Sequence, residues 1–288
     1  MKMHLVDAFT AKPFKGNPAA VVFVDSEPTD FAWMQSIGAE MNQPETCFVW
    51  PLNENQGQGD ASAQSESKAD WGLRWFTPEV EIQLCGHATL ASAHMLWSEG
   101  LVEVSQPVRF FTPMVGYYLN CSLDQENQSI RMSFPAMSVE SFDVPAGVIE
   151  ALGVDILDSQ RCPNGTLLFE IASDEELIGL KPDFCKLAES TSDVVIVTAL
   201  SDRDSENVVS RFFAPDKGID EDPVTGSAHC IIGPYWGARL GRTTLVCYQA
   251  SKRGGFLNLE LAGDKVYISG QAVTVMQGDW KIDPAFSL

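Results

Sequence analysis

Glu45 is the residue of this chain best placed by its neighbours to move a proton. It stands immediately before a run of apolar, β-forming residues. A carboxylic acid in apolar surroundings has its pKa raised, which suits it to take and return a proton near neutral pH. Most glutamates are exposed, so a solvated residue at the start of a strand is the competing interpretation. Glu45 is therefore a candidate general acid/base, and both interpretations remain open from this segment alone.

Two glycine motifs could hold an anion. One is CGHAT, which begins at Cys85, and the other is TGSAH, which begins at Thr225. Each precedes an apolar segment of helical length, and the first turn of a helix offers unbonded backbone N–H groups and a positive dipole end. Such a site can bind a carboxylate without lysine or arginine. A glycine at the start of a helix is also an ordinary structural feature, so that interpretation stays open.

The two motifs belong to an internal repeat, which indicates that the chain consists of two similar halves. Arg74 opens the run RWFTP and Arg211 opens the run RFFAP, and each run is followed by an acidic loop and then by one of the glycine motifs. The offset between the copies is close to half of the 288 residues. An arginine followed by two aromatic residues favours a strand, which the proline ends. Each half should therefore present a strand, a loop and one buried helix.

Beyond the repeat, helical patterns are few and strand patterns are many. The first helix is expected over 87–98, with Gly100 as its stop, and the second contains Gly233 and Pro234, which should kink or break it. Helices are too few to cover a parallel sheet. The expected fold class is α+β, with two pseudo-symmetric domains, each a curved, mostly antiparallel sheet wrapped around a central helix. Residues 53–70 are polar and predict an exposed loop, and strands are expected at 5–9, 19–24, 108–111, 117–123, 130–134, 166–171, 194–198, 244–248, 257–261, 266–268 and 272–276.

Composition limits the classes of partner. The formal net charge is −20, which disfavours nucleic acids and anionic membranes, and no apolar run reaches the length of a membrane helix. The seven cysteines are irregularly spaced without a C-x-x-C pair, and no secretory signal precedes the first strand. We therefore expect a cytoplasmic protein. Phosphate-binding and dinucleotide motifs are missing, so no cofactor and no metal are expected, and His229 with Cys230 is too small a set of metal ligands.

These motifs together resemble the PhzF-like (phenazine biosynthesis) isomerase family, which has the diaminopimelate epimerase fold. The sequence looks closer to the broad group of uncharacterised members than to the phenazine-pathway enzyme, whose corresponding motif lacks the cysteine and the proline found here. The resemblance covers almost the whole chain, at 7–9 (DAF), 16–19 (GNPA), the Glu45 segment, 74–89, 211–229 and 253–255 (RGG).

The resemblance implies residue roles and a domain division. In the family's isomerase a glutamate that matches Glu45 moves a proton between carbon atoms of a cyclohexadiene acid, in a cleft between the halves. The first half is expected at 1–118 plus 277–288 and the second at 119–276. A homodimer and a small carboxylate substrate are implied as well. The resemblance assigns Glu45, His87 and Asp222 to catalysis and, as substrate-binding residues, Gly86, Gly226, Ser227, Cys85, Thr225 and Asn17.

The function expected from these residues is a cofactor-independent isomerase that shifts a proton on a small carboxylate. One alternative is a two-base amino-acid racemase or epimerase, which needs a cysteine directly before the glycine in both halves. The first position is Cys85, but the second is Thr225, whose hydroxyl is far too weak an acid to replace a thiol. The other alternative is a catalytically silent binding protein of the same fold, against which the retention of Glu45, His87 and Asp222 argues.

Overall fold

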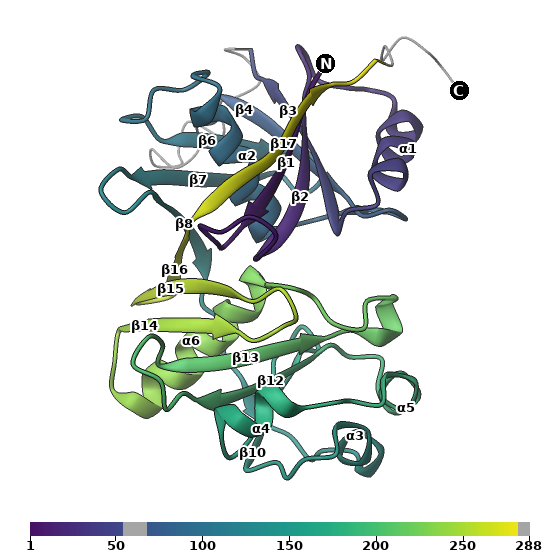
Figure 1. Cartoon of the computed structure of the whole chain (residues 1–288), viewed down its shortest axis with the longest axis vertical. Coiled ribbons are helices and arrows are strands. Elements are labelled where there is room, and N and C mark those ends of the chain that lie inside the picture. The colour runs from purple at the N-terminus through teal and green to yellow at the C-terminus, as the bar shows by residue number, and fades with distance from the viewer. Residues whose placement is uncertain (54–67, 282–288) are drawn as a thin grey trace. The chain divides into compact units, whose positions relative to one another are not determined.

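The chain folds into two compact units, both built from strands and helices (Figure 1). The computed structural model describes residues 1–53 and 68–281, so most of the loop predicted at 53–70 lies outside the described residues. Unit 1 comprises Met1–Ser133 and Ser269–Leu288, and unit 2 comprises Phe134–Ile268. The sequence analysis instead assigned 119–133 and 269–276 to the second half. They join unit 1 because each forms strands that pair with other strands of that unit.

Unit 1 is a mixed sheet in which most neighbours are antiparallel, with two parallel pairs, β2 with β3 and β4 with β6. A short strand, β5 (Glu81–Ile82), pairs with β4 at the sheet's side. From one strand to its neighbour the order is β17 (Ala272–Asp279), β1 (Lys2–Ala8), β2 (Asn17–Phe23), β3 (Glu45–Pro51), β4 (Trp71–Phe76), β6 (Val108–Thr112), β7 (Tyr117–Asp124) and β8 (Ser129–Pro135).

The central helix of unit 1 is α2 (Gly86–Ser98), which packs against β1, β2, β3 and β17. The small and apolar side chains of α2 lie on nearly all of its sides, and most of them are buried, as predicted. Gly100 follows the helix with a positive φ of 66°. A second helix, α1 (Phe31–Met41), was not predicted. It connects the parallel strands β2 and β3, and Asp30 caps it by accepting a hydrogen bond from the Trp33 amide at 3.0 Å.

Unit 2 repeats this architecture around α6 (Gly226–Leu240), which packs against β14 and β15. Three shorter helices, also unpredicted, are α3 (Ala146–Leu152), α4 (Asp174–Gly179) and α5 (Phe184–Ser190). A 3₁₀ turn spans Pro215–Lys217. Another strand, β16 (Lys265–Gly270), comes after the last strand of this sheet in the sequence. From one strand to its neighbour the order is β9 (Glu140–Ser141), β10 (Asp158–Arg161), β11 (Leu167–Glu170), β12 (Val195–Leu200), β13 (Val208–Phe213), β14 (Thr244–Gln249) and β15 (Gly255–Ala262).

The two sheets have the same sequence of strand directions. Starting from β17 in unit 1 and from β9 in unit 2, the successive pairs are antiparallel, antiparallel, parallel, antiparallel, parallel and antiparallel. Arg74 lies in β4 and Arg211 in β13, which are the fifth strands of these two series. The repeat seen in the sequence is therefore a repeat of the fold, and the predicted α+β class with two similar domains is confirmed.

Gly233 and Pro234 were expected to kink or break the second helix, and the structure shows that they do not break it. α6 runs from Gly226 to Leu240 without interruption. A proline cannot donate to the carbonyl four residues earlier, which here belongs to Cys230. That carbonyl instead accepts a hydrogen bond from the amide of Met137 at 2.9 Å. The lost helix bond is thus replaced by a bond from another segment of unit 2.

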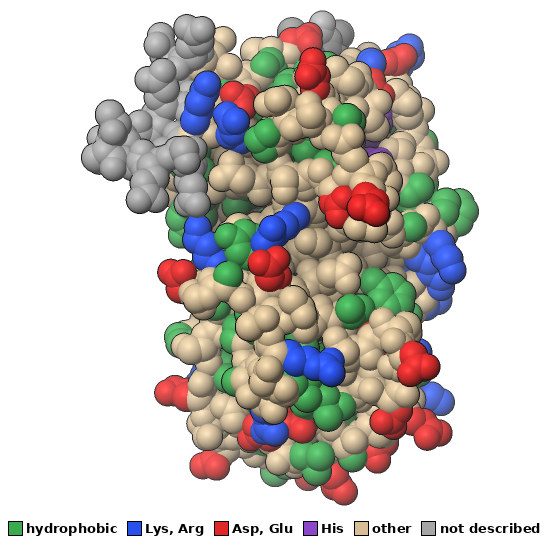
Figure 2. All heavy atoms as spheres, turned by 90° about the vertical axis from the view of Figure 1, so that its left-hand side faces the viewer, with side chains coloured by type: hydrophobic (Ala, Val, Ile, Leu, Met, Phe, Trp, Pro, Cys, Tyr) green, Lys and Arg blue, Asp and Glu red, His purple; other side chains and the backbone are tan. Residues whose placement is uncertain are grey.

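The surface carries scattered charge. On the face shown in Figure 2, acidic side chains are interspersed with basic ones, in a chain whose formal net charge is −20. Among the described residues, none of the helices has the length and apolar character that a membrane crossing requires.

Candidate functional site

Glu45 and His87 meet in unit 1. Glu45 is the first residue of β3 and lies opposite Ala19 of the parallel strand β2, whereas His87 lies in the first turn of α2. Glu45 Oε2 is 3.0 Å from His87 Nε2, and the two side chains are only 13% and 5% exposed. This separation is within the range over which a proton can pass between a carboxylate and an imidazole. Two candidate residues that are far apart in sequence are therefore brought into contact by the fold.

The other ring nitrogen of His87 faces two further predicted site residues. Asn17 Nδ2 lies 3.2 Å from His87 Nδ1, and Cys85 Sγ lies 3.4 Å from the same nitrogen. An amide NH₂ group is a donor, so in this arrangement Nδ1 accepts and the ring hydrogen sits on Nε2, which faces Glu45. The Asn17 amide thus favours the tautomer of His87 that has its hydrogen on Nε2.

Backbone geometry at the start of β2 determines where Asn17 lies. The preceding residue, Gly16, has a φ of +64°, and a Cβ atom there would come within 2.1 Å of the carbonyl oxygen of Ala8. Only glycine fits this turn. At the start of α2, Cys85 has extended backbone (φ −141°) and its side chain does not cap the helix, while the Thr89 hydroxyl donates to the Cys85 carbonyl at 2.6 Å. Gly86 is partly buried beside them.

In unit 2, the predicted residues Asp222 and Thr225 are joined by a short hydrogen bond in which the Thr225 hydroxyl donates to Asp222 Oδ2. Both precede α6, whose first residues are the predicted Gly226, which is buried, and Ser227, which is exposed. The Thr225 hydroxyl is thus a donor to a carboxylate and not a base. The structure brings these four residues together within unit 2, as it brings Asn17, Glu45, Cys85, Gly86 and His87 together within unit 1.

Gln249 holds this segment of unit 2 in place, and the sequence analysis missed it. Its Oε1 accepts a hydrogen bond from the Thr225 amide at 2.8 Å, and its Nε2 donates to the Asp222 carbonyl at 2.8 Å and to the Thr225 hydroxyl oxygen at 3.2 Å. The side chain is fully buried at the end of β14. The only signal in the sequence was a polar residue directly after a predicted strand.

The two repeat arginines form ion pairs with glutamates of the acidic loops that precede the central helices. Arg74 Nη1 donates to Glu81 Oε1 at 2.8 Å. Arg211 makes a bidentate pair with Glu221, at 2.6 Å from Nε and 2.9 Å from Nη2. Both arginines are at least nine-tenths buried. The repeat motif therefore has a structural role in both units, which its occurrence in the sequence did not reveal.

The side chains of His229 and Cys230 contact backbone carbonyl oxygens at the start of α6. His229 Nδ1 lies 2.8 Å from the carbonyl oxygen of Thr225, and Cys230 Sγ lies 3.9 Å from that of Gly226. Burial lowers the pKa of His229 to about 4, so the ring is neutral at physiological pH, and burial raises the pKa of Cys230 to about 12. Thr89 bonds the equivalent carbonyl in unit 1, so His229 occupies a structural position.

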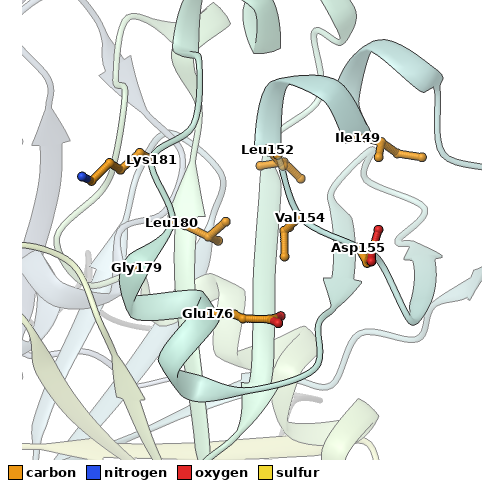
Figure 3. Close-up of a pocket in the computed structure, with 9 residues that line it drawn as sticks. Ile149, Leu152, Val154, Asp155, Glu176, Gly179, Leu180 and Lys181 are labelled. Carbon is orange, nitrogen blue, oxygen red and sulfur yellow. The ribbon is translucent and has the colours of Figure 1, made fainter.

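Three possible metal ligands do come together elsewhere. One donor atom each of Glu45, Cys85 and His87 lie within 4.8 Å of one another. Sequence spacing could not show this set, because Glu45 comes from another strand. A hollow in unit 2, between α3 and α4, has a volume of about 770 Å³ and is lined by none of the predicted site residues (Figure 3). Leu152, Val154 and Leu180 form part of its wall, with Glu176 at its rim.

The chain matches known proteins over nearly its whole length. The model of the PhzC-PhzF family, described as phenazine biosynthesis-like protein, matches residues 6–278. An uncharacterised isomerase of Halalkalibacterium halodurans is 40% identical over 278 residues, which cover 96% of this chain and 97% of that protein. The crystal structure of a PhzF-family phenazine biosynthesis protein from Enterococcus faecalis is similar with a TM-score of 0.85 and 36% identity, covering 98% of this chain and 99% of that one.

A more distant likeness identifies the fold alone. A probable proline racemase from Agrobacterium radiobacter has a TM-score of 0.63 at 12% identity, covering 99% of this chain and 94% of that one. The two-unit architecture is thus shared with racemases, while the sequence match is specific. The chain belongs to the PhzC-PhzF family of phenazine biosynthesis-like proteins.

Proposed function

We propose that the protein is a cofactor-independent isomerase that shifts a proton between carbon atoms of a small carboxylate, with Glu45 as the general acid/base. The observation that carries this proposal is the 3.0 Å contact between Glu45 Oε2 and His87 Nε2, made by side chains that are almost entirely buried. An acid/base pair that lies largely out of bulk water can transfer a proton to and from a bound carbon acid.

In the proposed reaction, the Glu45 carboxylate removes a proton from a carbon that is made acidic by a conjugated carboxylate. The electrons of the broken C–H bond form an extended enolate. Glu45, now protonated, returns the proton to a different carbon, the double bond moves, and no atom or electron is gained or lost. His87 Nε2 lies 3.0 Å from Oε2 of Glu45, so the imidazole can act as the proton-relay partner of the carboxylate between the two transfers.

The backbone amides at the start of α2 would face the substrate's negative charge. The side chain of Cys85 leaves the first turn uncapped, and amides at this end of a helix stabilise a carboxylate or an enolate. Asp222, Thr225, Gly226 and Ser227 of unit 2 are proposed to serve the same substrate, as the family resemblance implies. The homodimer is likewise a prediction that follows from the resemblance, and the cytoplasmic location is a prediction from the cysteine pattern and the lack of a secretory signal.

A two-thiol racemase is the rival function. In the described part of the chain all seven cysteines are free, and the position equivalent to Cys85 is Thr225, whose hydroxyl already donates to Asp222. A hydroxyl held in this way is no substitute for a second thiol base. Cys85→Ala separates the two functions, because the thiol mechanism expects activity to collapse and the glutamate mechanism expects a loss of less than about tenfold.

Proton exchange in D₂O tests the proposal directly. The protein would be incubated with a panel of β,γ-unsaturated and α-acidic carboxylates, and ¹H NMR would follow deuterium incorporation and double-bond migration. Glu45→Gln should slow exchange by about 10² to 10⁴, because it keeps the shape of the side chain and removes the base. Glu40→Gln, at an exposed position on α1, is the matched control and should exchange like the wild type.

Two outcomes would contradict the proposal. Exchange that Glu45→Gln leaves unchanged would remove Glu45 from the chemistry. Substrate binding by isothermal titration calorimetry, with no exchange for any bound carboxylate, would instead make the protein a binding protein of this fold.

A further inference from the structure

We propose that Glu45, Cys85 and His87 form a binding site for a thiophilic divalent cation, with Zn²⁺ as the physiological candidate, and that the bound cation inhibits the enzyme. The binding part stands on the geometry of unit 1 alone. The inhibition part rests on the proposed function, since it assumes that Glu45 and His87 carry out the proton transfer.

The bond lengths of a tetrahedral zinc site set how far apart its donor atoms lie. Zn–S bonds of about 2.3 Å and Zn–N bonds of about 2.0–2.1 Å at a tetrahedral angle place the sulfur and nitrogen roughly 3.5 Å apart. Cys85 Sγ lies 3.4 Å from His87 Nδ1, and Glu45 Oε2 lies 3.0 Å from His87 Nε2. A single cation uses only one of the two ring nitrogens, and the three donors lie within 4.8 Å of one another. One of the two other ligands, Cys85 or Glu45, must therefore rotate toward the ring nitrogen that binds the cation.

The three ligands are held on regular elements. Cys85 and His87 flank the first residue of α2, and Glu45 begins β3, which packs against that helix. Ligands placed by a helix start and a strand lose little conformational entropy when they bind a cation. Each side chain is largely buried, with Cys85 at 7% and His87 at 4% exposure. Water would complete the coordination, as in zinc sites that have three protein ligands.

The donor types determine which cation is bound. One thiolate, one imidazole and one carboxylate suit Zn²⁺ and Cd²⁺, whereas Mg²⁺ and Ca²⁺ prefer sites made of oxygen atoms only. Binding forms a metal–sulfur bond and releases the thiol proton of Cys85 to solvent, so no oxidant or reductant is needed. Once the cation holds Glu45 and His87, neither can exchange a proton with a substrate.

Cadmium titration of the full chain without an affinity tag tests the binding, because a cadmium–thiolate bond gives a charge-transfer absorption band in the ultraviolet. Wild type should bind one equivalent of Cd²⁺, and Zn²⁺ should displace it and reduce the absorption. Cys85→Ser should lose the band and bind Zn²⁺ at least about tenfold more weakly. Cys185→Ser, which removes an exposed cysteine on α5 of unit 2, is the matched control and should behave like the wild type.

The possible failures are distinguishable. A band that persists in Cys85→Ser, or wild-type protein that shows no saturable Cd²⁺ band, overturns the site. Thermal unfolding of Cys85→Ser like that of the wild type establishes that a lost band reflects a lost ligand; if this variant does not fold, Glu45→Gln replaces it and should weaken Zn²⁺ binding in equilibrium dialysis. Saturable binding without inhibition of proton exchange overturns the inhibition part. Absence of exchange from every variant, with Cd²⁺ binding intact, would contradict the proposed function and leave the site standing.

Discussion

The two units share one strand framework but differ in what stands around the start of their central helix. In unit 1, His87 at the start of α2 contacts a carboxylate from a strand, Glu45. In unit 2, the carboxylate is Asp222, from the loop before α6, and it accepts a hydrogen bond from the residue that precedes the helix, Thr225. The same architecture thus presents an acid/base pair in one unit and a fixed hydrogen-bonded turn in the other.

Strand register identifies the residue that replaces the glutamate in unit 2. The repeat arginine Arg74 lies opposite Phe48 of β3, and Arg211 lies opposite Val197 of β12. Counting back three residues from each partner leads from Phe48 to Glu45 and from Val197 to Val194. Unit 2 therefore has an aliphatic side chain where unit 1 has the proposed base.

The largest effect expected from this comparison of the two units concerns the second residue of each helix. His87→Asn should lower the rate of substrate proton exchange by about 10², because the ring that contacts Glu45 is removed. Ser227→Ala removes an exposed hydroxyl from the equivalent position and should cost about tenfold or less. The NMR exchange assay in D₂O measures both. Equal losses in the two variants would mean that the units contribute equally to the chemistry.

The sequence was sufficient to predict the duplication, the central helices and most strands. These features depend on local patterns, such as the apolar helix after Cys85 and the aromatic run after Arg74, which leave their mark within a dozen residues. The unpredicted helix α1 buries one side, at Trp33, Met34, Ile37 and Gly38, so a local apolar pattern was present in the sequence and was missed. It forms because two parallel strands must be connected, which is a requirement of the whole sheet.

The site was predictable in its parts and not in its contacts. Glu45 and His87 were candidates for separate reasons, but only the fold shows that their side chains meet. Gln249 had no signature, since its role depends on amides contributed from another segment. Pro234 misled the prediction for the same reason, because the Met137 amide that compensates for it lies far away in sequence. Long-range hydrogen bonds are the common element in these cases.

A second comparison concerns the residues that bond the first carbonyl of each helix, Thr89 in unit 1 and His229 in unit 2. Only His229 titrates. Its pKa is about 4 in the folded protein and near 6.5 when unfolded, so between these values the unfolded chain binds the proton. The part of the unfolding free energy that depends on a neutral His229 is therefore fully present above pH 6.5 and is lost as the pH falls toward 4.

Replacing His229 by threonine, the residue type at the equivalent position of unit 1, tests this difference. His229→Thr should reduce the loss of unfolding free energy between pH 7.5 and pH 5 by about 2 kcal/mol, as measured by urea denaturation. Some dependence on pH should remain, because burial also lowers the pKa of His4 and brings that of His94 to about 4. An identical slope in wild type and variant would contradict the assignment of a neutral, buried His229.

The smallest predicted effect separates the two repeat arginines. Arg211 makes the bidentate pair with Glu221 and also donates through Nη1 to the carbonyls of Leu180 at 2.7 Å and Leu177 at 3.3 Å. Arg74 donates through Nη1 to Glu81. A lysine can replace one such bond but cannot reproduce a planar fork. Arg211→Lys should therefore lower the free energy of unfolding by about 1–2 kcal/mol more than Arg74→Lys does, in urea denaturation at pH 7.5. Equal costs would show that the fork in unit 2 adds nothing to stability beyond the single ion pair of unit 1, and that the two units are more alike in energy than in geometry.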